Sequence, residues 1–96
     1  MITGNDFEEI TNQMTEIFCK KNKDYGDSFS SCLDEFGLVA GIVRINDKIN
    51  RIKQIYKINE IEVTEEKLED TLLDLANYSV MTLLWLKNKE RNENKR

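Results

Sequence analysis

The stretch EDTLLDLANYSVMTLLWL, residues 69–86, decides the fold, because it is apolar enough to be buried and long enough for a helix of about five turns. At about 100° per residue, Asp70, Asp74 and Asn77 share one face of that helix, nearly opposite its leucine-rich face. The polar stripe continues one or two turns later into Trp85 and its apolar neighbours. A merely solvated face would not become apolar, so we expect the two carboxylates to line an internal or inter-subunit cleft.

The composition limits the possible fold class and binding partners. A chain of 96 residues supports one domain, residues 1–96, with a frayed polar tail over residues 90–96. No proline and only four glycines favour long helices, so the sequence predicts an all-α protein. The net charge of −4 argues against binding a nucleic-acid polymer. The sequence shows no pattern typical of a signal peptide or membrane span, so we expect neither, and we expect a cytoplasmic protein with no membrane partner.

The chain has no histidine, which limits its chemistry. Zinc sites of the usual Cys/His kind and His-dependent nucleophiles are excluded. The two cysteines, Cys19 and Cys32, form no metal-binding pair and are expected to be reduced thiols. Any catalysis must use carboxylates, lysines, tyrosines or a hard metal ion.

Hydrophobic periodicity predicts three helices, at about residues 5–23, 38–57 (or from near Leu33) and 64–89, with Thr64 capping the third. The serine-rich segment KNKDYGDSFSSC, residues 21–32, is predicted to be a loop with Gly26 as its turn or cap residue. The connector before the third helix is expected to hold at most a strand-like turn. The core stripe of the second helix is predicted at Leu38, Ile42, Ile45, Ile49, Ile52 and Tyr56.

These elements predict a three-helix antiparallel bundle. The third helix is apolar on nearly every side, and a monomer would leave one side in water. We therefore expect a homodimer or homotetramer whose subunits share a four-helix-like core. The side chains that would otherwise be exposed are Leu73, Val80, Leu84 and Trp85.

The second helix carries a candidate phosphate site in the sequence RINDKINR, residues 44–51. Three cations and one carboxylate recur at three- and four-residue steps, on a face about 120° from the isoleucine stripe. Arginine forks and a lysine charge suit a phosphate chain. The alternative is a surface ladder of ion pairs worth ~0.2–0.5 kcal/mol each. The residues are Arg44, Asp47, Lys48 and Arg51.

The third helix carries a candidate metal site. Glu66, Asp70 and Asp74 are spaced by four residues, and stacked carboxylates can hold Mg²⁺, which prefers hard oxygen ligands. The alternative is an ordinary acidic first half of a helix, favoured by the helix dipole. Asp74 lies too deep in the helix for that explanation, and aspartate is a poor helix former.

The loop between the first two helices offers a third group, Lys23, Asp24 and Tyr25. Tyr25 could stack on a base while Lys23 meets phosphate. The alternative is a polar turn whose tyrosine packs on the bundle.

Taken in order, this loop, the R-x-x-D-K-x-x-R helix and the D-T-x-x-D-L-x-N-Y helix resemble the nucleotide-modification-associated domain family. That family is related to the MazG-like all-α NTP pyrophosphatases. The resemblance implies an oligomeric helical bundle, a nucleotide cleft between helices and Mg²⁺ held by acidic residues. It implies metal and catalytic roles for Glu66 and Asp70, with Asp74 as a further metal ligand or, with Asn77, facing base or sugar.

The resemblance further implies phosphate contacts for Arg44, Lys48 and Arg51, and closure of the site by Asp24 with Tyr25. The pyrophosphatases place two carboxylates on their second helix, whereas this chain offers only Asp47 there, among cations. The expectation is thus a Mg²⁺-dependent nucleotide pyrophosphohydrolase-like protein. Two alternatives remain: a phage-type protein that sequesters a nucleotide or cyclic nucleotide immune signal without cleaving it, and a helical interaction protein with no small ligand.

Overall fold

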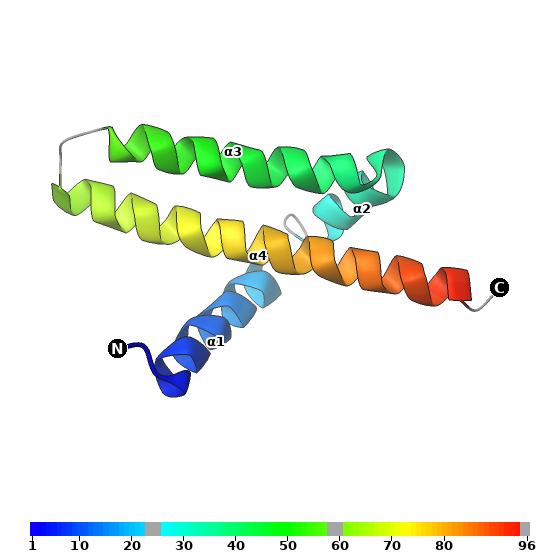
Figure 1. Ribbon diagram of the computed structural model, residues 1–96, viewed down its shortest axis with the longest axis horizontal. Helices are drawn as coiled ribbons and strands as arrows, with labels where there is room; N and C mark the ends of the chain where they lie inside the picture. Colours follow the sequence, from blue (N-terminus) through cyan, green and yellow to red (C-terminus); the bar gives the residue numbers. More distant parts are fainter. Residues whose placement is uncertain (23–25, 58–60, 95–96) are drawn as a thin grey trace.

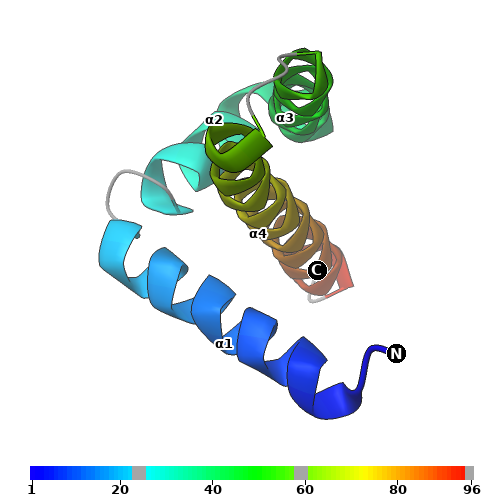
Figure 2. The same cartoon turned by 90° about the vertical axis from the view of Figure 1, so that its left-hand side faces the viewer.

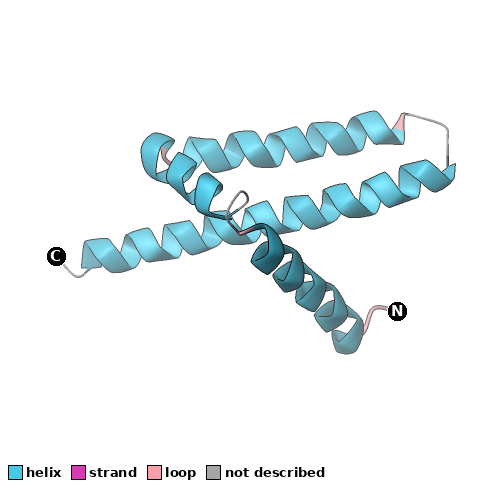
Figure 3. Cartoon of the chain, turned by 180° about the vertical axis from the view of Figure 1, so that it is seen from behind, coloured by secondary structure: helices cyan, strands magenta, loops and turns pink. Residues whose placement is uncertain are grey.

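The computed structural model describes residues 1–22, 26–57 and 61–94, and within these ranges its regular secondary structure is helical, with no strand (Figure 3). The predicted all-α class is confirmed. None of the helices in the described ranges is both long and apolar enough to cross a bilayer. The described residues form four α-helices, α1 (Gly4–Lys21), α2 (Ser28–Phe36), α3 (Leu38–Tyr56) and α4 (Ile61–Asn94).

Helix α1 begins with a reciprocal cap between Thr3 and Asp6. The Asp6 backbone N–H donates to Thr3 Oγ1 at 3.1 Å, and the Thr3 N–H donates to Asp6 Oδ2 at 3.0 Å. The backbone bond to Thr3, followed by the side-chain bond, lowers the pKa of Asp6 below its ordinary value. The cap therefore weakens only in acid, as the pH falls through that lowered pKa.

Helix α2 replaces the latter part of the predicted loop, so the prediction of three helices is wrong by one. Phe29 and Leu33, four residues apart, both lie buried on one face of this helix. Its serines lie on the exposed side or at its start, and this serine-rich composition led to the prediction of a loop. The cap is Gly37, with φ of 79° and an N–H that donates to Leu33 O at 2.7 Å. Gly26, expected to be the turn or cap residue of the loop, has no positive φ.

Helices α3 and α4 lie side by side as an antiparallel hairpin, and α2 packs across the end where α3 begins (Figure 1). Helix α1 crosses α4 near its middle and leans away from α3 (Figures 1 and 2). The core gathers where α2, α3 and α4 meet, with Phe18 of α1 at its edge. Its buried members are Phe29, Leu33 and Met81, against which Phe18, Ala40, Tyr78 and Trp85 pack.

The predicted core stripe of α3 is wrong for most of its members. Tyr56 is 79% exposed and Ile42 is 56% exposed, while the buried residues of this helix are Gly41 and Ile55. The reason is that α3 has only α4 beside it along most of its length, since α1 leans away. Within the described residues, Leu38, Ile42, Ile49 and Tyr56 of this stripe therefore form an exposed apolar face, while Ile45 and Ile52 are partly buried.

Helix α4 begins at Ile61, before the predicted cap Thr64, and continues to Asn94, beyond the expected end near residue 89. The connector expected to be strand-like is helical from residue 61 onward. Two of the buried residues of α4 are threonines, Thr71 and Thr82, whose hydroxyls donate to carbonyls one turn earlier. The helix backbone thus satisfies these two buried hydroxyls.

Gly41 sets the distance between α3 and α4. A Cβ at this position would lie 2.9 Å from both Cγ2 and Oγ1 of Thr82. Thr82 is 7% exposed and its Oγ1 donates to Tyr78 O at 2.7 Å, so it has little freedom to move. We expect Gly41→Ala to destabilise the protein by about 1–2 kcal/mol, even though alanine is the better helix former by about 1 kcal/mol.

Urea unfolding followed by Trp85 fluorescence measures this effect. Gly4→Ala is the matched control, because no atom lies within 4 Å of a Cβ placed there. Removing the obstacle with Thr82→Ala should make Gly41→Ala less harmful. A Gly41→Ala protein as stable as the wild type would show that the two helices do not need this close approach.

Candidate functional site

An ion pair between α3 and α4 explains why Asp74 lies deep in an apolar helix. Lys48 Nζ of α3 lies 3.4 Å from Asp74 Oδ2 of α4, with both side chains partly buried. Arg44 Cζ and Lys48 Nζ each lie 5.7 Å from the centre of the Tyr78 ring. A solvent-accessible pair of this kind contributes about 1 kcal/mol or less, so its main effect is to hold Lys48 beside the tyrosine ring.

Tyr78 is the residue that sequence reasoning missed at this contact. Its ring meets Phe29 of α2 edge-on, with centroids 4.9 Å apart and planes at 81°. Tyr78 follows Asp74 by one helical turn, and that spacing is the signal that could have included it. Tyr78 of α4 therefore contacts α2 through Phe29 and α3 through Arg44 and Lys48.

Burial raises the pKa of the Tyr78 phenol above its ordinary value; the Arg44 guanidinium opposes this rise and the Asp74 carboxylate adds to it. We expect Arg44→Gln to raise the pKa of Tyr78 further and Asp74→Asn to lower it, since each change removes a charge at nearly constant size. Ring-carbon NMR shifts followed against pH measure both effects. Shifts of the pKa in the opposite directions would contradict the placement of these charges beside the ring.

The predicted phosphate face of α3 forms one cavity. Arg44, Lys48 and Arg51 all line it, as helical spacing predicted, and Asp47 is the carboxylate among them. The sequence did not single out the two neutral polar residues, which follow at the same helical steps. The cavity has a volume of about 440 Å³ and is lined by Arg44, Asp47, Lys48, Asn50, Arg51 and Gln54.

A second cavity lies beside the first, at the junction of α2 and α3. It is lined mainly by apolar side chains and has a volume of about 320 Å³. Two residues, Arg44 and Asp47, line both cavities. The apolar members of its lining are Phe29, Cys32, Phe36, Val39, Ala40 and Val43.

The acidic residues of α4 do not converge. Glu66 and Asp70 are exposed, and Asp74 lies against Lys48. Across residues 1–22, 26–57 and 61–94, no three Asp, Glu, Cys or His side chains come together as a group that could hold a metal ion. The described residues alone therefore do not fit the predicted Mg²⁺ site.

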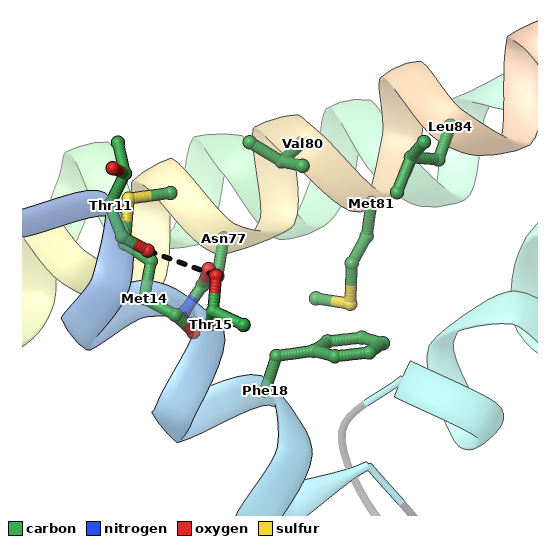
Figure 4. A pocket seen from close by; sticks show the side chains of 8 residues that line it. All are labelled: Thr11, Met14, Thr15, Phe18, Asn77, Val80, Met81 and Leu84. Atoms are coloured by element: carbon green, nitrogen blue, oxygen red, sulfur yellow. Dashed lines mark hydrogen bonds between the residues drawn. The ribbon is translucent and has the colours of Figure 1, made fainter. Parts of the chain in front are cut away.

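Asn77 lies away from the cationic cavity. It is buried, and its side-chain amide donates to Met14 O of α1 at 3.5 Å, the limit of a hydrogen bond. It forms part of an apolar groove of about 380 Å³ where α1 crosses α4 (Figure 4). The structure therefore does not bring Asn77 to the phosphate face. Lys23, Asp24 and Tyr25 lie outside the described residues.

Comparison with known proteins identifies the region that carries this site. The family model described as Nucleotide modification associated domain 1 matches residues 21–86. The chain belongs to this family. No curated protein and no solved structure matches the chain.

The match to Nucleotide modification associated domain 1 covers α2, α3 and most of α4, and it leaves out nearly all of α1. Both cavities that share Arg44 and Asp47 lie entirely within the matched region. The groove around Asn77 takes half of its lining from α1, which precedes that region. The two α3 cavities, unlike this groove, therefore lie wholly within the matched region.

Proposed function

We propose that the protein binds a phosphorylated nucleotide on α3, with the phosphates in the cationic cavity. The observation that carries the proposal is the charge of that cavity's lining. It contains three cations, Arg44, Lys48 and Arg51, and one carboxylate, Asp47. The family description, which names nucleotide modification, supports it.

The chemistry of the lining suits phosphate. Arginine presents planar pairs of N–H donors that match two phosphate oxygens, and lysine adds a point charge. The neutral amides of Asn50 and Gln54 can contact sugar or phosphate oxygens at the edge. The protein as a whole has a charge of −4, so a polyanion such as DNA would be repelled elsewhere while a single nucleotide needs only this face.

Binding is better supported than hydrolysis. Metal-assisted cleavage between phosphates needs carboxylates gathered on both sides of the cleft, and the described residues provide no such group. The Mg²⁺ predicted at Glu66, Asp70 and Asp74 would need further oxygen ligands from nucleotide phosphates or from another copy of the chain. Pyrophosphohydrolase activity, the MazG-like relationship and sequestration of a nucleotide signal are therefore alternatives to be separated by experiment.

Assembly into a homodimer or homotetramer remains part of the proposal. The uncovered isoleucine face of α3, with Ile42 at 56% and Ile49 at 38% exposure, is the main support. Val80 and Leu84 of α4 are also exposed, as expected for an unpartnered chain. Trp85, in contrast, is half-buried, and its indole N–H donates to Asp34 Oδ1 of α2 at 2.9 Å within the same chain.

The test is to incubate the purified protein with a panel of nucleotides, with and without Mg²⁺, and to identify both retained and released species. Intact nucleotide recovered after denaturation, even with EDTA, supports a binding protein. Monophosphate with pyrophosphate supports the pyrophosphohydrolase. Neither retained nucleotide nor product would contradict the proposal and favour a helical interaction protein without a small ligand.

A further inference from the structure

One side of α3 changes from apolar to charged and polar along its length. Toward its start, with the end of α2, this side is apolar, and from Arg44 onward it is charged and polar. At about 100° per residue, both cavities are centred on this side, roughly opposite the exposed isoleucine stripe. The two cavities are therefore neighbours on a surface separate from the face expected to meet another copy of the chain.

We propose that the apolar cavity holds the base of the nucleotide whose phosphates occupy the cationic cavity, an inference that rests on the proposed function. A nucleotide has a flat, weakly polar base at one end and charged phosphates at the other. The surface of α3 has the same order, and the two cavities share Arg44 and Asp47 in their linings. The sugar then lies at that junction, beside the Asp47 carboxylate.

Phe36 is the base platform in this arrangement. It lies at the last position of α2, lines the apolar cavity and is 62% exposed. Bases stack on exposed aromatic rings whatever their identity, because every base has a π-face. Val39 and Val43, each 55% exposed, line the same cavity from α3 and offer the base apolar contacts.

The dimensions agree with one ligand spanning both cavities. At 1.5 Å per residue, Val43 to Arg51 spans about 12 Å along α3. An extended nucleoside triphosphate covers a distance of this order from base to terminal phosphate. Bound in this way, the base covers an apolar surface that would otherwise stay in water, which adds affinity to that of the phosphates.

The experiment compares inorganic tripolyphosphate with the tightest-binding of the four common ribonucleoside triphosphates, by calorimetry on the full chain. We expect the nucleotide to bind about tenfold more tightly than tripolyphosphate. Phe36→Ala should weaken nucleotide binding about tenfold and leave tripolyphosphate binding unchanged. Phe36→Trp, which keeps an aromatic face, should preserve nucleotide affinity. Phe7→Ala is the matched control, since Phe7 is 67% exposed on α1, away from both cavities.

Three results would overturn the inference. Tripolyphosphate binding as tightly as the nucleotide, with Phe36→Ala neutral for both, would leave phosphate binding standing and remove the base site. If Phe36→Ala weakened the binding of both ligands equally, and light scattering showed a smaller assembly than for the wild type, Phe36 would be an interface residue. Failure of both ligands to bind the wild type would remove the proposed function as well.

Discussion

Arg44→Ala and Arg51→Ala each weaken nucleotide binding by roughly ten- to a hundredfold, because each removes a charge-assisted hydrogen bond worth ~1.5–3 kcal/mol. Both arginines line the cationic cavity of α3. Added salt should weaken wild-type binding more than binding by either variant, since the contacts are solvent-accessible and screened. Isothermal calorimetry at two salt concentrations measures both effects.

Lys53→Ala is the matched control, because Lys53 is an exposed cation of α3 that does not line the cavity. It should bind nucleotide as the wild type does. Arg51 gives the cleaner test of the two arginines, since Arg44 also lies over the Tyr78 ring. Circular dichroism should show unchanged helicity in all three variants. If both arginine variants bound nucleotide as tightly as the wild type, this face of α3 would be only a row of surface ion pairs.

Leu33→Ala should be the most destabilising single substitution in the core, with a loss of about 2–5 kcal/mol. Leu33 is 0% exposed, and it packs where α2 meets α3 and α4. The smaller side chain leaves a cavity that a short helix cannot close without shifting. For a domain of this size, that loss is a large share of the total stability.

Urea unfolding detects the loss, and Trp85 reports the position of α2 because its indole donates to Asp34. Leu83→Ala is the matched control, since Leu83 is 52% exposed, and it should change the unfolding free energy by no more than about 0.5 kcal/mol. Equal effects of the two substitutions would contradict the central place given to α2 in the core.

Periodicity within one helix was enough to predict that the cations of α3 share one face. Arg44, Lys48 and Arg51 share a side of α3 because of their spacing alone, and the structure places all three in one cavity. Helix α1 and its N-terminal cap were likewise predictable from local signals. These features depend only on residues close together in the sequence.

Features that depend on contacts between helices could not be predicted in this way. The apolar stripe of α3 was assigned to the core because its pattern is strong, but the direction of α1 leaves it uncovered. Asp74 and Asn77 share a helix side in the sequence pattern, yet one meets Lys48 of α3 and the other meets Met14 of α1. Which neighbour each meets depends on how the helices cross.

Helix α2 was missed for a different reason. Its serines and the preceding glycine are typical turn residues, and they outweighed the four-residue spacing of Phe29 and Leu33. In a helix of 9 residues, two buried side chains and one glycine cap suffice once tertiary packing is available. The apolar cavity beside Arg44 depends on this helix, so it could not be found before the fold was known.

The central claim, that the α3 cavities bind a nucleotide, is tested most directly by mapping backbone amide NMR shifts during titration with a nucleoside triphosphate. We expect the largest shifts over residues 36–54, with Arg44, Asp47 and Arg51 among them, and small shifts along α1. Largest shifts at the α1–α4 groove around Met14 and Asn77, or no shifts at millimolar nucleotide, would contradict the claim.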